Sequence, residues 1–261
     1  MKPPILENKA YDEEPVFRPA NLLREARRQK NKPNCNVPEI CVLDPDGDLV
    51  DYLKEQGMAT RNECWACYHS ELYSFRQEGR TIGILPCVVG APYATIVAEQ
   101  LFVSGCSLVV SVTSAGIINE EQVTHKFALI TESVRDEGTS YHYLPPEDKA
   151  GLNTELYKKL SGSSVNDSDA LYFEGKSWTT DAPYRETQSA IEAMKEQGVT
   201  CVEMESAALY AVAGKTGNDV ICFAHLTNTM AQNEGDFEKG ESFGSLDTLE
   251  LLSQVIKTLD Y

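Results

Sequence analysis

Residues 81–116 read TIGILPCVVGAPYATIVAEQLFVSGCSLVVSVTSAG, and this stretch decides the fold. Its apolar run over Thr81–Val89 is typical of a strand, and Pro92 suits the first turn of a helix. We expect that helix to continue to about residue 104, because Gly105 is a residue type that ends helices. Ser107–Val112 then has the Val-rich composition of a strand buried in a parallel sheet. A strand, a helix and a strand in this order predict neighbouring parallel strands.

The same alternation continues on both sides of this stretch. Further strands are expected over Glu39–Leu43, Phe127–Thr131, Leu171–Trp178, Thr200–Glu203 and Val220–Leu226. Further helices are expected over Leu152–Leu160, Pro183–Gln197, Glu205–Lys215 and Leu246–Leu259. The sequence therefore predicts one α/β domain over residues 39–261, with a mostly parallel, twisted central sheet flanked by helices. Residues 1–38 are rich in proline and charge and contain one expected helix, Ala20–Gln29. We expect them to form an N-terminal arm packed on the domain or on a partner subunit.

The chain is strongly acidic. It has 261 residues, of which 40 are Asp or Glu and 23 are Lys or Arg, so its formal net charge is −17. Such a surface repels phosphate backbones and anionic lipids, so we expect no nucleic-acid partner and no membrane partner. No apolar run approaches the ~18 residues of a membrane span, and the first 15 residues lack the apolar core of a secretory signal. We therefore expect a cytoplasmic protein.

The eight cysteines indicate reduced, buried thiols, because most of them lie in apolar stretches and cytoplasmic proteins keep thiols reduced. Cys64 and Cys67 form a CxxC pair close to His69. A zinc site normally needs a second pair or further histidines, which this sequence does not place nearby. We expect two half-buried thiols at this pair, no metal site and no organic cofactor.

Candidate functional residues follow the strands, because ligands bind at the carboxyl ends of strands in such sheets. Thr113–Gly116 follows a buried strand, and its small residues let backbone N–H groups approach a ligand closely. Glu203 and Glu205 lie between a short strand and a helix, in apolar surroundings. A capping role is one interpretation, since the helix dipole stabilises carboxylates there by about 0.3–1 kcal/mol. Buried carboxylates also need polar partners, and sugar hydroxyls would suit them.

These elements come in a particular order: GAP before a helix (90–92), TSAG (113–116), SVRDEGTSYHY (133–143), TTDAPY (179–184) and VEMESAALYA (202–211). In this order the sequence resembles the nucleoside phosphorylase family, which includes uridine and purine nucleoside phosphorylases. SVRDEGTSYHYLPP looks like the uridine phosphorylase branch. The resemblance spans residue 40 to the C-terminus. It implies an enzyme that cleaves the N-glycosidic bond of a nucleoside, a small-molecule substrate.

The resemblance also implies roles for individual residues around the sugar. Glu205 would hold the ribose hydroxyls, with Met204 beneath the sugar and Glu203 beside it. Ser114 would face the ribose and the nucleophile, and Gly116 belongs to the same substrate-contacting loop.

For the base, the resemblance indicates the loop around TTDAPYRET and the end of the late strand. Arg185 and Gln188 are the local candidates to contact the edge of a pyrimidine. Purine-specific members have a Ser-Asp after the late strand, and its Asp protonates or hydrogen-bonds the purine ring. This sequence has Thr227-Asn228 there. Asn228 cannot act as an acid, which favours a pyrimidine nucleoside.

The phosphate site departs from the family pattern. The uridine branch uses a Gly and an Arg of a GDPER-type turn and an Arg of a strand, where this sequence has Leu43, Gly47 and Ser111. The turn here reads LDPDGD (43–48), and its carboxylates would repel phosphate. A phosphorylase with inorganic phosphate as co-substrate would need other donors. The candidates are Arg61, Arg76 and Arg135.

Three functions therefore remain open. Phosphorolysis comes first, because most of the family framework is retained. A nucleosidase that uses water comes second, with Asp44 or Asp46 as the carboxylate that deprotonates it. A protein that binds a nucleoside without turnover comes third, and the intact Glu205 and Met204 disfavour it. Family members assemble as dimers, often grouped into hexamers, so the resemblance implies a homo-oligomer.

Overall fold

The computed structural model describes residues 3–164, 170–229, 237 and 239–259. The strands are β1 (Ile40–Asp44), β2 (Thr60–Arg61), β3 (Tyr73–Gln77), β4 (Arg80–Pro86), β5 (Leu108–Ile117), β6 (Phe127–Asp136), β7 (Ala150–Gly151), β8 (Tyr172–Thr180), β9 (Cys201–Glu203) and β10 (Asp219–Asn228). The α-helices are α1 (Pro19–Lys30), α2 (Asp48–Glu55), α3 (Ala91–Phe102), α4 (Thr154–Ser164), α5 (Gln188–Glu196), α6 (Ser206–Thr216) and α7 (Ser245–Leu259). Short 3₁₀ helices occur at Pro4–Leu6, Glu120–Gln122, Ser140–His142, Pro183–Arg185 and Glu241–Gly244.

The strands form one sheet, in the order β10-β6-β8-β9-β5-β1-β4-β3-β2, with β7 beside β6. Strand β10 pairs with both β5 and β6, so β5, β10, β6, β8 and β9 close into a ring. The central run β4-β1-β5-β10 is parallel, as the sequence predicts. The pairings β5–β9 and β10–β6 and the hairpin β3–β4 are antiparallel, so the sheet as a whole is mixed. One α/β domain with a central sheet flanked by helices is confirmed.

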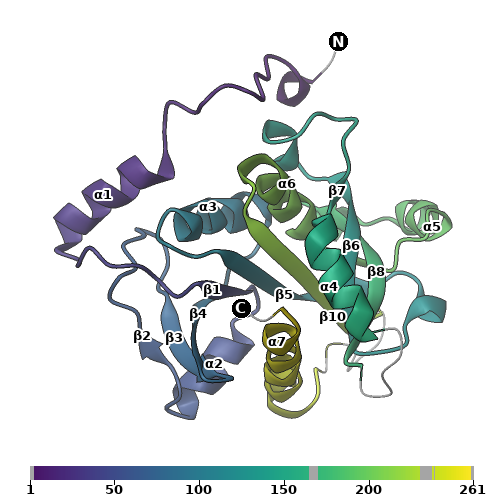
Figure 1. Cartoon of the computed structure of the whole chain (residues 1–261). Helices are drawn as coiled ribbons and strands as arrows, with labels where there is room; N and C mark the ends of the chain where they lie inside the picture. The colour runs from purple at the N-terminus through teal and green to yellow at the C-terminus, as the bar shows by residue number, and fades with distance from the viewer. Residues whose placement is uncertain (1–2, 165–169, 230–236, 238, 260–261) are drawn as a thin grey trace.

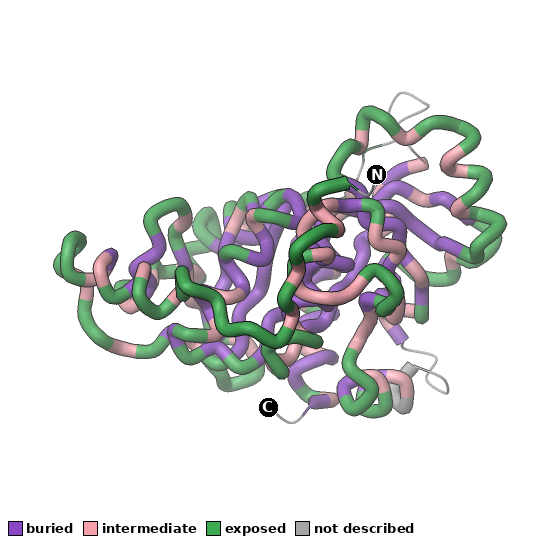
Figure 2. The backbone as a smooth tube through the Cα atoms, turned by 90° about the horizontal axis from the view of Figure 1, so that it is seen from above, coloured by how far each residue is buried: buried purple, intermediate pink, exposed green. Residues whose placement is uncertain are grey.

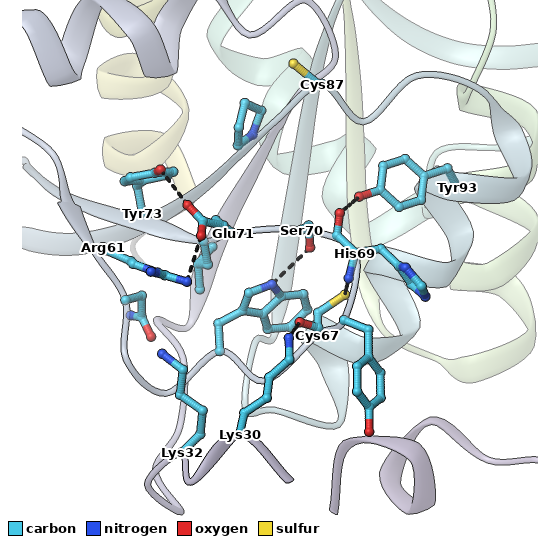
Figure 3. A pocket seen from close by; sticks show the side chains of 15 residues that line it. Lys30, Lys32, Arg61, Cys67, His69, Ser70, Glu71, Tyr73, Cys87 and Tyr93 are labelled. Atoms are coloured by element: carbon cyan, nitrogen blue, oxygen red, sulfur yellow. Dashed lines mark hydrogen bonds and ion pairs between the residues drawn. The ribbon is translucent and has the colours of Figure 1, made fainter. Parts of the chain in front are cut away.

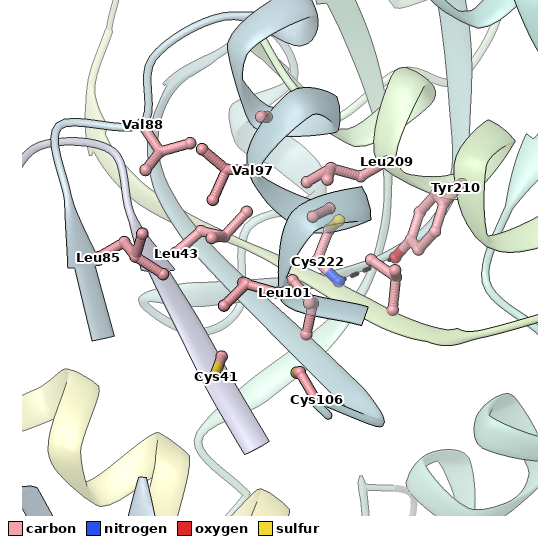
Figure 4. Packing of buried hydrophobic residues seen from close by; sticks show 14 of the residues in the cluster. Cys41, Leu43, Leu85, Val88, Val97, Leu101, Cys106, Leu209, Tyr210 and Cys222 are labelled. Atoms are coloured by element: carbon pink, nitrogen blue, oxygen red, sulfur yellow. Dashed lines mark hydrogen bonds between the residues drawn. The ribbon is translucent and has the colours of Figure 1, made fainter. Parts of the chain in front are cut away.

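Helices cover both faces of the sheet, because successive side chains of each strand alternate between two apolar layers (Figure 1). On one face, α3 and α6 bury Leu101 and Leu209 against Leu43 and Val109, as Figure 4 shows in part. On the other face, α2, α4 and α7 pack on the intervening residues, such as Val110 of β5. Figure 2 shows that the buried stretches occupy the middle of the molecule.

The N-terminal arm packs on its own domain. Leu23 and Ala26 of α1 lie against Ala66, and the Lys30 Nζ donates a hydrogen bond of 2.5 Å to the carbonyl oxygen of Cys67. In the described part of the chain, no helix has the length and apolarity needed to cross a bilayer.

Two sequence expectations need correction. Strand β5 does not stop at Val112 but continues to Ile117, because its polar TSAG segment pairs with β10 and then with β9. The expected helix Pro183–Gln197 is split into a 3₁₀ turn and α5. Thr187 has extended backbone angles and caps α5, with its Oγ1 accepting a hydrogen bond from the Ala190 N–H (3.4 Å).

The prediction of reduced thiols is wrong for Cys35 and Cys64, which form a disulfide with Cα atoms 5.2 Å apart. The CxxC pair is therefore not a unit, because Cys64 pairs with the arm while Cys67 stays free and buried. A partner 29 residues away leaves no local signal in the sequence.

Candidate active site

Glu203 ends β9 and is held entirely by the fold. Ser177 and Thr179 alternate along the neighbouring strand β8, so both face the same side and donate to Glu203 Oε1 at 3.0 and 2.5 Å. The backbone N–H groups of Glu205 and Ser206 donate to Glu203 Oε2, each at 2.7 Å. Four donors on one carboxylate fix the start of α6 and the turn that carries Glu205.

Glu205 is the N-cap residue of α6, and its side chain reaches across to two other elements. Its Oε1 accepts the N–H of Gly90, just before α3, at 2.6 Å, and its Oε2 accepts the Thr113 hydroxyl of β5 at 3.1 Å. The residue is 2% exposed. Burial, with Glu203 close by, raises the pKa of Glu205 to about 8. The carboxyl group is therefore mostly protonated at neutral pH and can both donate and accept hydrogen bonds.

A second cluster lies at the carboxyl ends of β1, β5 and β10. Asp46 Oδ2 accepts both the Ser114 hydroxyl (2.6 Å) and the Ser114 N–H (3.2 Å). The ammonium group of Lys239 lies 3.1 Å from Asp46 and 2.6 Å from Asp48. The lysine side chain is only 12% exposed, so these contacts are little screened by water.

Asp44 and His225 complete this cluster. Asp44 ends β1 and accepts the N–H groups of Gly47 (3.2 Å) and Val50 (2.9 Å), which bends the chain into α2. Burial raises the pKa of Asp44 to about 7. Burial, with the Lys239 charge nearby, lowers the pKa of His225 to about 4, so its imidazole is neutral at neutral pH. Together with Asp46, Ser114 and Lys239 they line a cavity of about 20 Å³, which is room for one water molecule.

The two clusters meet on β5. Thr113 contacts Glu205 on one face of the strand, and its neighbour Ser114 contacts Asp46 on the other. Gly116, two residues on, pairs with Val202 of β9 and lies beside the end of β10. The structure thus brings together Glu203, Glu205, Ser114 and Asp46, as the sequence suggests, with half-exposed Met204 between the two glutamates.

The three residues expected to contact the base differ in burial. Asn228 is buried at the end of β10, beside Gly116. Arg185 and Gln188 are exposed, and the Gln188 amide donates to Glu192 of its own helix (3.1 Å). Between them, burial raises the pKa of half-buried Glu186 to about 7.

None of the three expected phosphate arginines belongs to these clusters. Arg135 binds its own following loop, donating to Ser140 Oγ and to the carbonyl oxygens of Leu144, Pro145 and Asp148 at 2.6–2.9 Å. Arg76 closes the β3–β4 hairpin through Thr81 and Gly79. Arg61 pairs with Glu71 at 2.7 Å in a separate cavity. Leu43 and Ser111 are buried within the sheet and present no anion donor.

Sequence reasoning missed several residues of these clusters. Thr113 and Gly90 lie inside motifs that were recognised, so each has a local signal in TSAG or GAP. Lys239 has none, because it is 191 residues from Asp48 and follows no strand. Among the described residues, no three His, Cys, Asp or Glu side chains are grouped as a metal site.

Known proteins resemble this chain in sequence and in fold. A guanosine phosphorylase from Halorubrum lacusprofundi is 24% identical over 191 residues, covering 70% of this chain and 75% of that protein. A DeoD-type purine nucleoside phosphorylase from Hahella chejuensis is 23% identical over 186 residues, covering 70% and 79%. The solved structure of uridine phosphorylase from Vibrio fischeri has the same fold, with a TM-score of 0.71, 23% identity, and coverage of 87% of this chain and 92% of that one.

The sequence model of the phosphorylase superfamily matches residues 39–255. That match spans every strand of the sheet and both side-chain clusters. This chain therefore belongs to the phosphorylase superfamily.

Proposed function

We propose that this protein cleaves the N-glycosidic bond of a pyrimidine nucleoside, with inorganic phosphate as the co-substrate. The observation that carries the proposal is the buried carboxyl group of Glu205, held between Gly90, just before α3, and Thr113 of β5. Membership of the phosphorylase superfamily supports the reaction class.

The chemistry follows from the protonation of Glu205. A neutral carboxyl group donates one hydrogen bond and accepts others, which matches the adjacent hydroxyls of a ribose. Hydrogen bonds to the 2′-hydroxyl that tighten as the sugar becomes positive lower the barrier. A phosphate oxygen forms the new bond to C1′, and the electron pair of the broken C1′–N bond leaves with the base. The departing base takes up the proton that hydrogen phosphate loses, so the products are the free base and a pentose 1-phosphate.

Asn228 supports a pyrimidine as the base. It is buried at the end of β10, where its amide can donate and accept hydrogen bonds but cannot supply a proton to a purine ring.

Phosphate would compete with Asp46 for its donors. The hydroxyl and N–H of Ser114, with the Lys239 ammonium group, are suited to an anion, and Asp46 occupies them. The Asp46 side chain is 35% exposed, so it has room to turn outward when phosphate enters.

A second candidate function is hydrolysis, and one observation favours it. The cavity beside Asp46 has room for one water molecule, and the Asp46 carboxylate is oriented by Ser114 and Lys239. A positioned carboxylate can take a proton from water as it attacks C1′.

The variant Asp46→Ala distinguishes the two reactions, because it should favour phosphorolysis and impair hydrolysis. For a phosphorylase we expect the KM for phosphate to fall, because a competing negative charge is removed. For a hydrolase we expect turnover to fall about 100-fold or more, because the base is lost. Release of free base from uridine, with and without phosphate, measures both.

The control is Asp51→Ala, which removes an exposed carboxylate of α2 outside the cluster. It should leave both constants unchanged. Wild-type turnover that does not respond to phosphate would reject phosphorolysis, and no base release from any nucleoside would reject both functions.

The resemblance also supports a homo-oligomer, and light scattering would measure its mass. A cytoplasmic location stays a prediction, and the Cys35–Cys64 disulfide is a bond more usual in oxidising compartments.

A further inference from the structure

A large cavity lies away from both clusters of the candidate active site. Its volume is about 910 Å³, at the upper end of the range for small-molecule sites. It is enclosed by the end of the N-terminal arm, the segment 61–73 and the start of α3 (Figure 3). Neither Glu205 nor Asp46 lines it.

Three cationic side chains line part of this cavity, in a chain whose net charge is −17. Lys30, Lys32 and Arg61 line it, against a single carboxylate, Glu71. The Lys32 side chain is 15% exposed, and its Nζ lies 2.6 Å from Glu63. Ammonium and guanidinium groups have three and five N–H donors, so each cation keeps donors for a ligand beyond the contact it makes here.

Aromatic rings form another part of the wall. Tyr68 and Tyr93 line the cavity together with Trp65. The Trp65 indole donates to Ser70 Oγ at 3.0 Å, and the Tyr93 hydroxyl donates to the His69 carbonyl oxygen at 3.0 Å. These contacts fix the rings in place. A flat apolar group can therefore stack there without a large loss of side-chain freedom.

The disulfide connects the two sides of this cavity. Lys30 and Lys32 belong to the arm, and Cys35 follows them by a few residues. Arg61 belongs to the domain, and Cys64 follows it. The Cys35–Cys64 bond therefore holds the arm cations opposite Arg61 and the aromatic rings.

We propose that this cavity binds a nucleoside monophosphate, with the phosphate on Lys30, Lys32 and Arg61 and the base among the aromatic rings, and that the Cys35–Cys64 disulfide assembles the site. Phosphate is the group that clustered Lys and Arg residues recognise, and a nucleobase is the flat group that tyrosine and tryptophan stack on. The site is separate from the one proposed for the unphosphorylated substrate.

The cavity borders the candidate active site through backbone contacts. Cys87 lines it, and the Cys87 N–H donates to the Asp44 carbonyl oxygen at 2.8 Å. A ligand seated here therefore lies one backbone contact from the turn that carries Asp46.

The test is calorimetric titration of the full chain with uridine monophosphate, adenosine monophosphate, uridine and inorganic phosphate. We expect a monophosphate to bind at least tenfold more tightly than uridine or phosphate alone. Lys32→Ala and Arg61→Ala should each weaken that binding about tenfold, the usual loss for a charge-assisted contact. Lys158→Ala, which removes a surface lysine in a comparable ion pair on α4, should leave it unchanged.

The disulfide is tested by repeating the titration after reduction and with the double variant Cys35→Ser/Cys64→Ser. We expect both to weaken monophosphate binding at least fivefold. Unchanged affinity in both would reject the role of the disulfide.

Four outcomes would overturn the site itself. These are no monophosphate binding at millimolar concentration, phosphate alone binding as tightly, and loss of binding in Glu205→Ala but not in Lys32→Ala. The fourth is a Lys32→Glu variant that shifts the solution mass from dimer to monomer, which would make the cavity an interface between copies. Because these readouts are binding and mass, they are independent of whether the protein proves to be a phosphorylase or a hydrolase.

Discussion

Glu203 and Glu205 are separated by one residue, and they differ in how many hydrogen bonds the fold donates to each side chain. Glu203 accepts four hydrogen bonds from the fold, while Glu205 accepts two and is buried beside the other carboxylate. The first arrangement positions the second: two of the four donors are the backbone N–H groups of Glu205 and Ser206. The Glu205 carboxyl group is therefore already buried and keeps hydrogen-bonding capacity for a ligand.

Replacing Glu205 with Ala should reduce kcat/KM for nucleoside cleavage about 100-fold or more. That loss corresponds to about 2.7 kcal/mol of transition-state stabilisation, within the range for leaving buried hydrogen-bonding groups without their partner. Circular dichroism should show an intact fold, because Glu203 still holds the start of α6. Wild-type turnover in this variant would mean that Glu205 does not contact the sugar.

Glu205 should also make stability depend on pH. Its folded pKa of about 8 lies above the ordinary 4.5, so its contribution is full below pH 4.5 and is lost as pH rises through 8. In Glu205→Gln the amide oxygen can still accept from Gly90 and the amide N–H can donate to Thr113, without the titration. From pH 5 to 9 this variant should therefore gain at least about 1 kcal/mol relative to wild type.

Thermal unfolding of both proteins across that pH range measures the difference. His225 has a pKa of about 4, so its contribution to stability is lost as pH falls from 6.5. Both proteins contain His225, so this contribution cancels in the difference between them. A difference that stays constant from pH 5 to 9 would place the pKa of Glu205 near its ordinary value.

At the scale of elements, the Val-rich pattern of β5 and the Pro and Gly signals around α3 are visible in the sequence because they depend on neighbouring residues. The extension of β5 through TSAG is not visible. Its polar residues are kept in the strand by β10 and β9, more than 80 residues further on. The sequence predicts Glu205, Ser114 and Asp46 as site residues, because each follows a strand or belongs to a motif. It does not predict Lys239, because only the tertiary fold brings that residue to Asp46.

The turn between β1 and α2 depends on Gly47, whose φ is +84°. A Cβ there would lie 3.1 Å from the Sγ of Cys87, so Gly47→Ala has a backbone cost and a contact cost. We expect a loss of about 2 kcal/mol in unfolding free energy and reduced turnover, since Asp44 and Asp46 would shift.

Gly57→Ala is the matched control for this turn. Gly57 has a φ of +66°, but a Cβ there meets nothing within 4 Å. It should lose only the backbone cost, about 1 kcal/mol, and keep full turnover. Equal effects of the two substitutions in urea unfolding and in turnover would show that the Cys87 contact is unimportant.

At the scale of the whole molecule, the disulfide encloses β1, the acidic turn and α2 in one covalent loop, because Cys35 and Cys64 are 29 residues apart. Closing a loop of this length restricts the unfolded chain and is worth about 3.6 kcal/mol in the chain-entropy model. It also joins the arm covalently to the domain, in addition to non-covalent contacts such as Leu23 on Ala66 and Lys32 with Glu63.

Reduction should therefore lower the free energy of unfolding by about 3.6 kcal/mol. Urea unfolding with and without dithiothreitol measures this. The double variant Cys35→Ser/Cys64→Ser should have the stability of the reduced protein, and dithiothreitol should not change it. If reduction left the urea midpoint unchanged, the arm would not be covalently joined to the domain in solution.

The closed ring of strands has a consequence for how the protein is made. Strand β5 is synthesised early, but β10, which pairs with it along its length, ends at Asn228. Strand β5 therefore lacks a neighbour on one edge until β10 has been synthesised, and Thr113 lacks its contact until Glu205 has been added. The candidate site can therefore form only late in synthesis, once β5, β9 and β10 are all present. Until that step, the growing chain presents an unpaired strand edge that other polypeptides can occupy.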